Sequence, residues 1–115
     1  MVKSKGYSPE RGDIVWLNFN PQSGLEQAGR RPALVISPQT YNQKTELAIC
    51  CPITSQIKDY PFEVKIPECL EIRGVVLSDQ FKSLDWKTRE AEFICKLPKP
   101  ELNEVLGKIN VLINP

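Results

Sequence analysis

The sequence contains no histidine among its 115 residues. Histidine is the commonest general acid and base near neutral pH and a frequent metal ligand. Any proton transfer by this chain must therefore use carboxylates, arginine, lysine, tyrosine, cysteine or backbone groups.

Cysteines are few and lack the spacing of a metal site. The four are Cys50, Cys51, Cys69 and Cys95, with no C-x-x-C pair among them. Structural zinc sites usually show closely paired ligands, so we expect no metal and no other cofactor. Cys50 and Cys51 lie in an apolar run and are typical of small core residues. We expect reduced thiols and therefore a cytoplasmic protein.

Long apolar runs and an excess of one charge are also missing. No run approaches the roughly 18 residues that span a bilayer, and residues 1–10 lack the apolar segment of a signal peptide. The formal net charge is +1, so no overall basic field indicates a nucleic acid partner. The length predicts a single domain over residues 1–115, with residues 1–10 as a loose leader.

Short strands dominate the pattern. Branched and aromatic residues between turn signals predict six strands, at residues 14–19, 33–37, 46–53, 62–66, 74–78 and 91–97. Apolar residues at helical spacing from Leu102 to Ile113 predict an amphipathic helix packed on the sheet. Residues 39–45 fit a helical turn or a loop, and residues 79–87 fit a compact turn or one helical turn. Pro52 places the far end of its strand at an edge or a bulge. The fold class is mainly β, a small barrel or a strongly curled sheet.

The segment from Gly24 to Pro32 is too long and too charged for a simple strand connection. Its neighbours Arg30 and Arg31 point to opposite sides in an extended chain. Pro32 favours an extended conformation at Arg31, which holds that guanidinium at the mouth of a buried strand. Such a guanidinium suits bidentate binding of phosphate. The alternative is a surface pair with Glu26 that contributes little.

Thr54 and its neighbours follow the third strand. If the second and third strands are antiparallel neighbours, Thr54 returns to the end where Arg31 begins. A hydroxyl beside a guanidinium can hold a phosphate oxygen. The alternative is an ordinary hydrogen bond within a turn.

A second polar cluster follows the strand at residues 74–78. It includes Asp79, Gln80 and Lys82, which either line a groove or form a solvated turn. Tyr60 and Trp86 have polar neighbours and are the aromatic residues best suited to stack on bases.

Several of these segments together resemble the MazF/PemK family of toxins from bacterial toxin–antitoxin pairs. The resemblance runs from Arg11 to the end of the C-terminal helix. Its segments are RGDIVWLNFNP, GLEQAGRRPALVISP, PITSQ, YPFEV, GVVLSDQFKSLDW and ELNEVLGKINVLI. The branch that contains MazF is the most similar.

The resemblance implies a small SH3-like or CcdB-like β-barrel with a C-terminal helix, assembled as a homodimer. It implies a metal-independent endoribonuclease that cuts single-stranded mRNA at short motifs. The implied products carry a 2′,3′-cyclic phosphate (or a 3′-phosphate) and a 5′-hydroxyl. Gyrase poisons of the same fold are the alternative, because they bind a protein and cut no RNA.

The resemblance also implies site residues. The catalytic arginine, threonine and loop glutamate of the family correspond to Arg31, Thr54 and Glu26. The PemK-like branch uses an Arg-x-Asp, of which only Asp79 is present because Leu77 occupies the arginine position. We expect RNA contacts from polar residues around the catalytic three: Asn20, Gln27, Arg30, Ser55, Gln56, Lys58, Asp79, Gln80 and Lys82.

Implied partners are single-stranded RNA, the acidic C-terminal tail of a cognate antitoxin, and a second copy of the chain. The toxin–antitoxin complex is expected to bind operator DNA, and no membrane is involved. Residues 53–57 and the region of Trp86 are candidates for the dimer interface.

Overall fold

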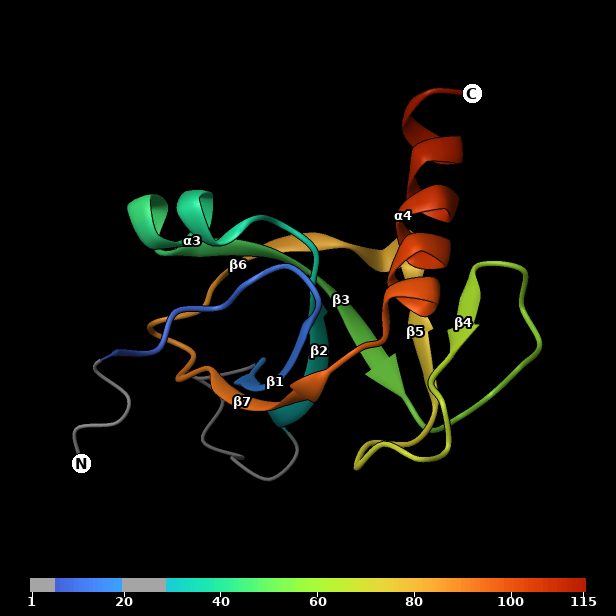
Figure 1. The fold of residues 1–115 in the computed structure, drawn as a ribbon, viewed down its shortest axis with the longest axis horizontal. Helices are drawn as coiled ribbons and strands as arrows, with labels where there is room; N and C mark the ends of the chain where they lie inside the picture. The colour runs from blue at the N-terminus through green and yellow to red at the C-terminus, as the bar shows by residue number, and fades with distance from the viewer. Residues whose placement is uncertain (1–5, 20–28) are drawn as a thin grey trace.

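The computed structural model describes residues 6–19 and 29–115. Within those ranges the elements follow in a simple order (Figure 1): β1 Asp13–Asn18, β2 Arg30–Val35, α3 Gln39–Thr45, β3 Leu47–Thr54, β4 Glu63–Lys65, β5 Val75–Leu77, η1 Ser78–Gln80, β6 Lys82–Asp85, β7 Glu92–Lys96 and α4 Lys99–Ile113.

The strands form one curled, antiparallel sheet in the order β4-β5-β3-β2-β1-β7, with β6 also paired to β3. The expected mainly β fold with a C-terminal helix is confirmed. Closure of the sheet into a barrel is not confirmed, because the strand path ends at β4 and β7 in the part of the chain that the structure describes. The helix α4 stands beside β4 and β5 in Figure 1 and adds Leu102, Val105 and Ile109 to the core shared by β1–β5. The helix therefore covers apolar surface on one face of the open sheet.

The segment after β5 was predicted incompletely. Its first part is the helical turn η1, but residues 82–85 form the strand β6 instead of continuing the turn. Here β6 pairs with the first half of β3, from Leu47↔Asp85 to Cys50↔Lys82. The polar residues Lys82 and Ser83 are exposed, so this strand lacks the apolar pattern by which the others were predicted.

β3 is the central strand. It pairs with β2 on one side, and on the other with β6 and then β5. Pro52 lies in the gap between the β6 and β5 ladders, where η1 separates these two strands. The expectation of an edge is wrong for this strand, because β3 is paired on both sides. The break between its two ladders falls at Cys51 and Pro52, and proline has no N–H to donate there.

Two apolar clusters lie on the two faces of the sheet. The larger contains Leu34, Cys51, Val76 and the α4 residues, and the smaller contains Ala33, Val35 and Cys50. Both cysteines are thus core residues, as expected, and all four cysteines are free thiols. Because neighbouring residues of β2 point to opposite faces, its apolar run serves both clusters.

The last turn of α4 extends beyond the sheet. Leu102, Val105 and Ile109 are buried, whereas Leu112 and Ile113 are exposed, contrary to the predicted packing of the whole apolar stripe. The C-terminus lies clear of the sheet in Figure 1. No helix within residues 6–19 and 29–115 is long and apolar enough to cross a membrane.

Residues 6–10, the described part of the predicted leader, are held against the sheet. Tyr7 Oη donates to Asp13 Oδ2 at 2.8 Å, and Asn42 Nδ2 donates to the carbonyl of Pro9 at 2.9 Å. Asp13, only 4% exposed, also forms an ion pair with Lys96 at 2.7 Å. These contacts pair polar groups of residues 6–10 with buried polar groups of Asp13 and Asn42, so the described part of the leader is held in place and is not loose.

Candidate functional site

The register of β2 and β3 places two candidate residues at one edge of the sheet. The strands are antiparallel, with Ala33↔Pro52 as the last paired residues. Continued by two residues, this register puts Arg31 across from Thr54. Directly opposite residues of antiparallel strands share a face of the sheet. The expectation that Thr54 returns to the end where Arg31 begins is therefore confirmed.

Arg30, the neighbour of Arg31, points toward β1 and β7. Its Nη1 donates to Asn18 Oδ1 at 2.9 Å, and its Nη2 donates to the Glu90 carbonyl at 3.2 Å and to Glu92 Oε1 at 3.0 Å. Arg30 thus meets a carboxylate on β7. Arg31 is exposed. This arrangement gives Arg30 a bracing role between strands, and its contact with RNA stays a prediction.

A groove of about 290 Å³ begins at Thr54. One wall comes from the chain between β3 and β4, and the other comes from the end of β5 and from η1. Its lining residues are Thr54, Gln56, Lys58, Tyr60, Glu63, Leu77, Asp79 and Gln80. Five of these are predicted site residues, and Tyr60 was predicted as a stacking residue. The two polar clusters, distant in sequence, therefore face one groove.

Thr54 is tightly fixed by its neighbours. Its Oγ1 accepts a hydrogen bond from the Gln56 backbone N–H at 3.1 Å, which is the turn contact considered from the sequence. The hydroxyl proton remains available for a ligand, because this bond uses only a lone pair.

Gly74, with φ of 125°, precedes β5, and a Cβ there would collide with the Thr54 carbonyl. Glycine at this position thus permits the close approach of β5 to Thr54.

Asp79 connects the two walls. Tyr60 Oη donates to Asp79 Oδ2 at 2.9 Å. This hydrogen bond, more than the nearby charge, raises the pKa of Tyr60, so the phenol keeps its proton and remains a donor. Asp79 Oδ1 and Ser78 Oγ are buried without a hydrogen-bond partner among the described residues. Unlike the predicted solvated turn, this cluster forms an ordered wall of the groove.

Glu63 is a groove residue that the sequence reasoning missed. Its carboxylate oxygens accept the Lys58 backbone N–H at 3.1 and 3.3 Å. The alternating pattern of residues 62–66 indicated an outward side chain at this position, but nothing in the pattern shows that the preceding chain turns back over it.

Other predicted residues lie apart from the groove or outside the described ranges. Ser55 is exposed beside it, and Lys82 Nζ lies over the Phe19 ring, 5.5 Å from the centroid. Trp86 is a poor stacking residue, because it packs on the smaller core cluster and its Nε1 donates to the Asn42 carbonyl at 3.0 Å. Asn20, Glu26 and Gln27 lie outside the described residues.

The described residues hold no group of three or more His, Cys, Asp or Glu side chains that could bind a metal ion. The groove instead presents amide, hydroxyl, phenol, ammonium and carboxylate groups. Such a mixture can hydrogen-bond the base edges and phosphates of an unpaired nucleic acid strand.

Comparisons with known proteins find similar sequences and a similar fold. Residues 10–113 match the model of the PemK-like, MazF-like toxins of type II toxin–antitoxin systems. The chain is 48% identical over 107 residues to the endoribonuclease toxin MazF of Escherichia coli K12, covering 93% of this chain and 96% of that protein. It is 32% identical over 108 residues to the endoribonuclease PemK of Escherichia coli, covering 90% and 81%. A crystal structure of MazE–MazF from Deinococcus radiodurans superposes with a TM-score of 0.85 at 48% identity, covering 94% of this chain and 97% of that chain.

Proposed function

The chain belongs to the family of PemK-like, MazF-like toxins of type II toxin–antitoxin systems, and we propose that it is an endoribonuclease that cuts single-stranded mRNA at the groove beginning at Thr54. The observation that carries the site is the β2–β3 register, which brings the start of β2, with Arg31, to the end of β3, with Thr54. The names of the relatives support the activity: MazF and PemK of Escherichia coli are both endoribonucleases.

The proposed cleavage needs no nucleophile from the protein. The substrate's 2′-hydroxyl attacks the adjacent phosphorus, the 2′-oxygen–phosphorus bond forms, and the bond from phosphorus to the 5′-oxygen breaks. The proton of the 2′-hydroxyl leaves to a base, and the departing 5′-oxygen takes up a proton. The products are a 2′,3′-cyclic phosphate, or a 3′-phosphate after hydrolysis, and a 5′-hydroxyl. The protein must align these atoms and stabilise the charge that develops on the phosphate oxygens.

The protein's own groups divide this work. Arg31 stabilises the negative phosphate oxygens, since a guanidinium keeps its charge and donates through a planar fork. Thr54 donates its free hydroxyl proton to one of those oxygens. Glu26, which lies outside the described residues, takes the 2′-hydroxyl proton or orients Arg31. We propose the reaction to be independent of metal ions.

The remaining groove residues bind the strand on either side of the scissile bond. Lys58 adds positive charge, and Gln56 and Gln80 offer both donors and acceptors to base edges. The Tyr60 ring, on a side chain that is 46% exposed, offers a face for stacking.

The proposed partners follow from the same site. The MazF of Deinococcus radiodurans was crystallised with MazE. We propose that a cognate antitoxin covers the groove with an acidic tail, that two copies of the chain form the toxin, and that the complex binds operator DNA. Residues 53–57 and the Trp86 region remain the proposed dimer interface. We propose a cytoplasmic location, because the proposed substrate is mRNA.

The direct test is cleavage of a long single-stranded RNA in excess EDTA. We expect discrete fragments with 5′-hydroxyl ends, and Arg31→Ala should lower the rate by roughly a hundredfold or more. Arg73→Ala is the matched control, because Arg73 is exposed and outside the groove lining. An intact RNA together with a stalled gyrase would establish the alternative, a gyrase poison. An undiminished rate in folded Arg31→Ala would remove Arg31 from the site.

A further inference from the structure

One wall of the groove is an exposed strap, which we define as residues 55–62 between β3 and β4. Residues 55–61 are all exposed, and no strand or helix forms within the strap. Nevertheless it supplies Gln56, Lys58 and Tyr60 to the groove lining. A wall without a ladder of its own depends on individual contacts to keep its position.

The first anchor of the strap crosses the groove. The hydrogen bond from Tyr60 Oη to Asp79 Oδ2, 2.9 Å long, ties the strap to η1 on the opposite wall. The Tyr60 and Phe62 rings also pack together, with centroids 5.9 Å apart. This anchor sets the distance between the two walls near the middle of the strap.

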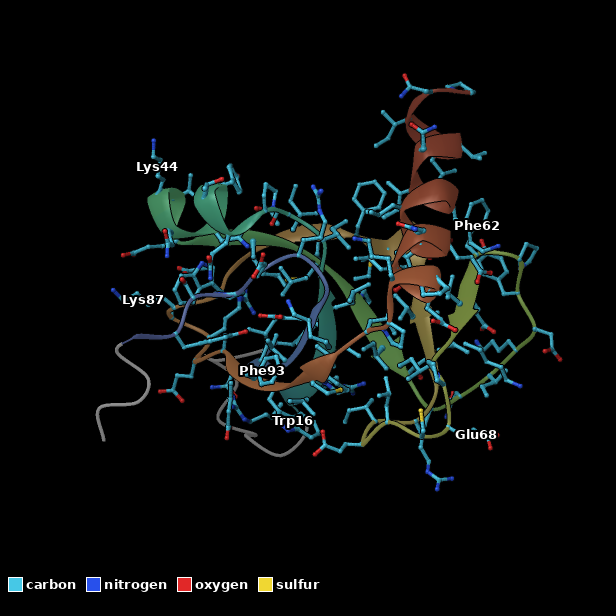
Figure 2. All side chains as sticks on the ribbon, viewed as in Figure 1. Trp16, Lys44, Phe62, Glu68, Lys87 and Phe93 are labelled. Carbon is cyan, nitrogen blue, oxygen red and sulfur yellow. The ribbon has the colours of Figure 1, made fainter. Side chains whose placement is uncertain are left out.

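The second anchor comes from behind the groove. Lys108 in the third turn of α4 donates from Nζ to the carbonyl of Pro61 at 2.6 Å. Figure 2 shows Phe62, the last residue of the strap, beside this helix. Lys108 does not line the groove, so it has no direct route to a ligand bound there. Because the ammonium is charged, this is the stronger type of hydrogen bond.

Contacts with Glu63, the first residue of β4, hold the strap between its anchors. The Glu63 carboxylate accepts the Lys58 N–H, and the Glu63 N–H donates to the Tyr60 carbonyl at 2.9 Å. Asp59 adopts a φ of 57°, a left-handed conformation that aspartate tolerates better than most residues. The strap is therefore tied to β4 at one end, and its two anchors tie it to η1 and to α4.

We propose that the hydroxyl of Tyr60 and the ammonium of Lys108 have a positioning role and hold the strap at the groove width required for RNA binding, apart from any stacking by the Tyr60 ring. This inference depends on the proposed ribonuclease function for its kinetic consequence. The anchors hold the free protein in a binding-ready form, so their loss adds an ordering cost to RNA binding. The reacting groups at Thr54 and Arg31 belong to the strands β3 and β2, which are paired independently of the two anchors, and the strap reaches Thr54 through the Gln56 N–H. Loss of an anchor should therefore raise KM and leave kcat nearly unchanged.

The test uses Lys108→Met, Tyr60→Phe and the rescue variant Lys108→Arg, which keeps a charged donor. Lys99→Met is the matched control, because Lys99 is an exposed lysine at the first position of the same helix. Amide hydrogen exchange over the strap measures its mobility without RNA. Steady-state cleavage of a short single-stranded RNA measures KM and kcat.

We expect Lys108→Met and Tyr60→Phe each to speed strap exchange and to raise KM by roughly two- to tenfold, the range of one hydrogen bond, with kcat changed by less than about twofold. Lys99→Met should match the wild type, and Lys108→Arg should restore most of the difference. Unchanged strap exchange in both anchor variants would overturn the inference. So would faster exchange without a higher KM, or a KM increase equal to that of Lys99→Met. A wild-type protein that cuts no RNA would refute the proposed function, while the exchange rates would still report on the anchors.

Discussion

Thr54 has two roles in the proposed site, and both depend on its hydroxyl. Its Oγ1 accepts the Gln56 N–H at 3.1 Å, and its hydroxyl proton is proposed to bind a phosphate oxygen. Thr54→Val removes both interactions but keeps the branched shape that suits the end of a strand. Thr54→Ser keeps the hydroxyl and removes only a methyl group. Comparing the two variants therefore isolates the hydroxyl.

The expected magnitudes of the two losses differ. The turn hydrogen bond is exposed, so its loss should cost about 0.5–1 kcal/mol of unfolding free energy and lower Tm by roughly 2–5 °C. Against a total stability of roughly 5–15 kcal/mol, nearly all molecules remain folded. One lost hydrogen bond to the transition state lowers kcat by about a hundredfold or more. Reduced stability therefore cannot account for a kcat change of that size.

The assay pairs thermal unfolding with single-turnover cleavage of one labelled RNA in EDTA. Thr54→Val should unfold a few degrees below the wild type and cleave about a hundredfold more slowly, whereas Thr54→Ser should stay within about tenfold of the wild-type rate. If Thr54→Val cleaves like the wild type despite its lower Tm, the hydroxyl serves only the turn, and Thr54 has no part in catalysis. Equal losses in Thr54→Val and Thr54→Ser would instead indicate that the hydroxyl alone does not sustain the rate, because Thr54→Ser keeps the hydroxyl and lacks only the methyl group.

Three predictions concern the scaffold. Leu34→Ala, at a fully buried position of β2, should lower the free energy of unfolding by about 2–5 kcal/mol in urea titrations, and a loss below about 1 kcal/mol would contradict the packing described. Asn42→Ala should cost about 2–4 kcal/mol and increase amide exchange around Pro9, whose carbonyl loses its donor; unchanged exchange there would show that the N-terminal segment is held by other contacts. Burial raises the pKa of Cys50 and of Cys51 from 9.0 to about 12. Since the unfolded chain loses these thiol protons from about pH 9 and the folded chain keeps them until about pH 12, stability should fall as pH rises through this range, by up to ~1.4 kcal/mol per pH unit for each thiol. Urea unfolding at about pH 8 and about pH 10.5 measures this loss, and Cys50→Ala should reduce it; the same loss in that variant would assign the effect to other groups.

Some features of this protein follow from local patterns alone. The near-continuous apolar run at 33–36 predicts a strand buried on both faces, and those residues serve two separate core clusters. The alternation over residues 62–66 predicts inward Phe62, Val64 and Ile66; Val64 and Ile66 are buried, and Phe62 is half-buried. These patterns succeed because burial on one or both faces imposes a spacing that is visible within a few residues.

Contacts between elements that are distant in the sequence do not follow from such local patterns. The strand β6 has an unremarkable polar sequence and exists because β3 offers it a ladder. The end of α4 continues an apolar stripe that the sheet is too short to cover, so Leu112 and Ile113 remain exposed. Neither outcome can be inferred from spacing, since each depends on where another element stops.

The same division applies to the site. The sequence by itself determined the chemical types, with arginine, threonine and a polar cluster at the ends of predicted strands and no histidine to share their work. Only the tertiary structure decided that Thr54 and Asp79 face one groove, that Glu63 belongs to it, and that Lys108 reaches its outer wall. The physical reason is chain topology: Lys108 and Pro61 are 47 residues apart, and no local pattern encodes which helix face meets which turn once the sheet has curled.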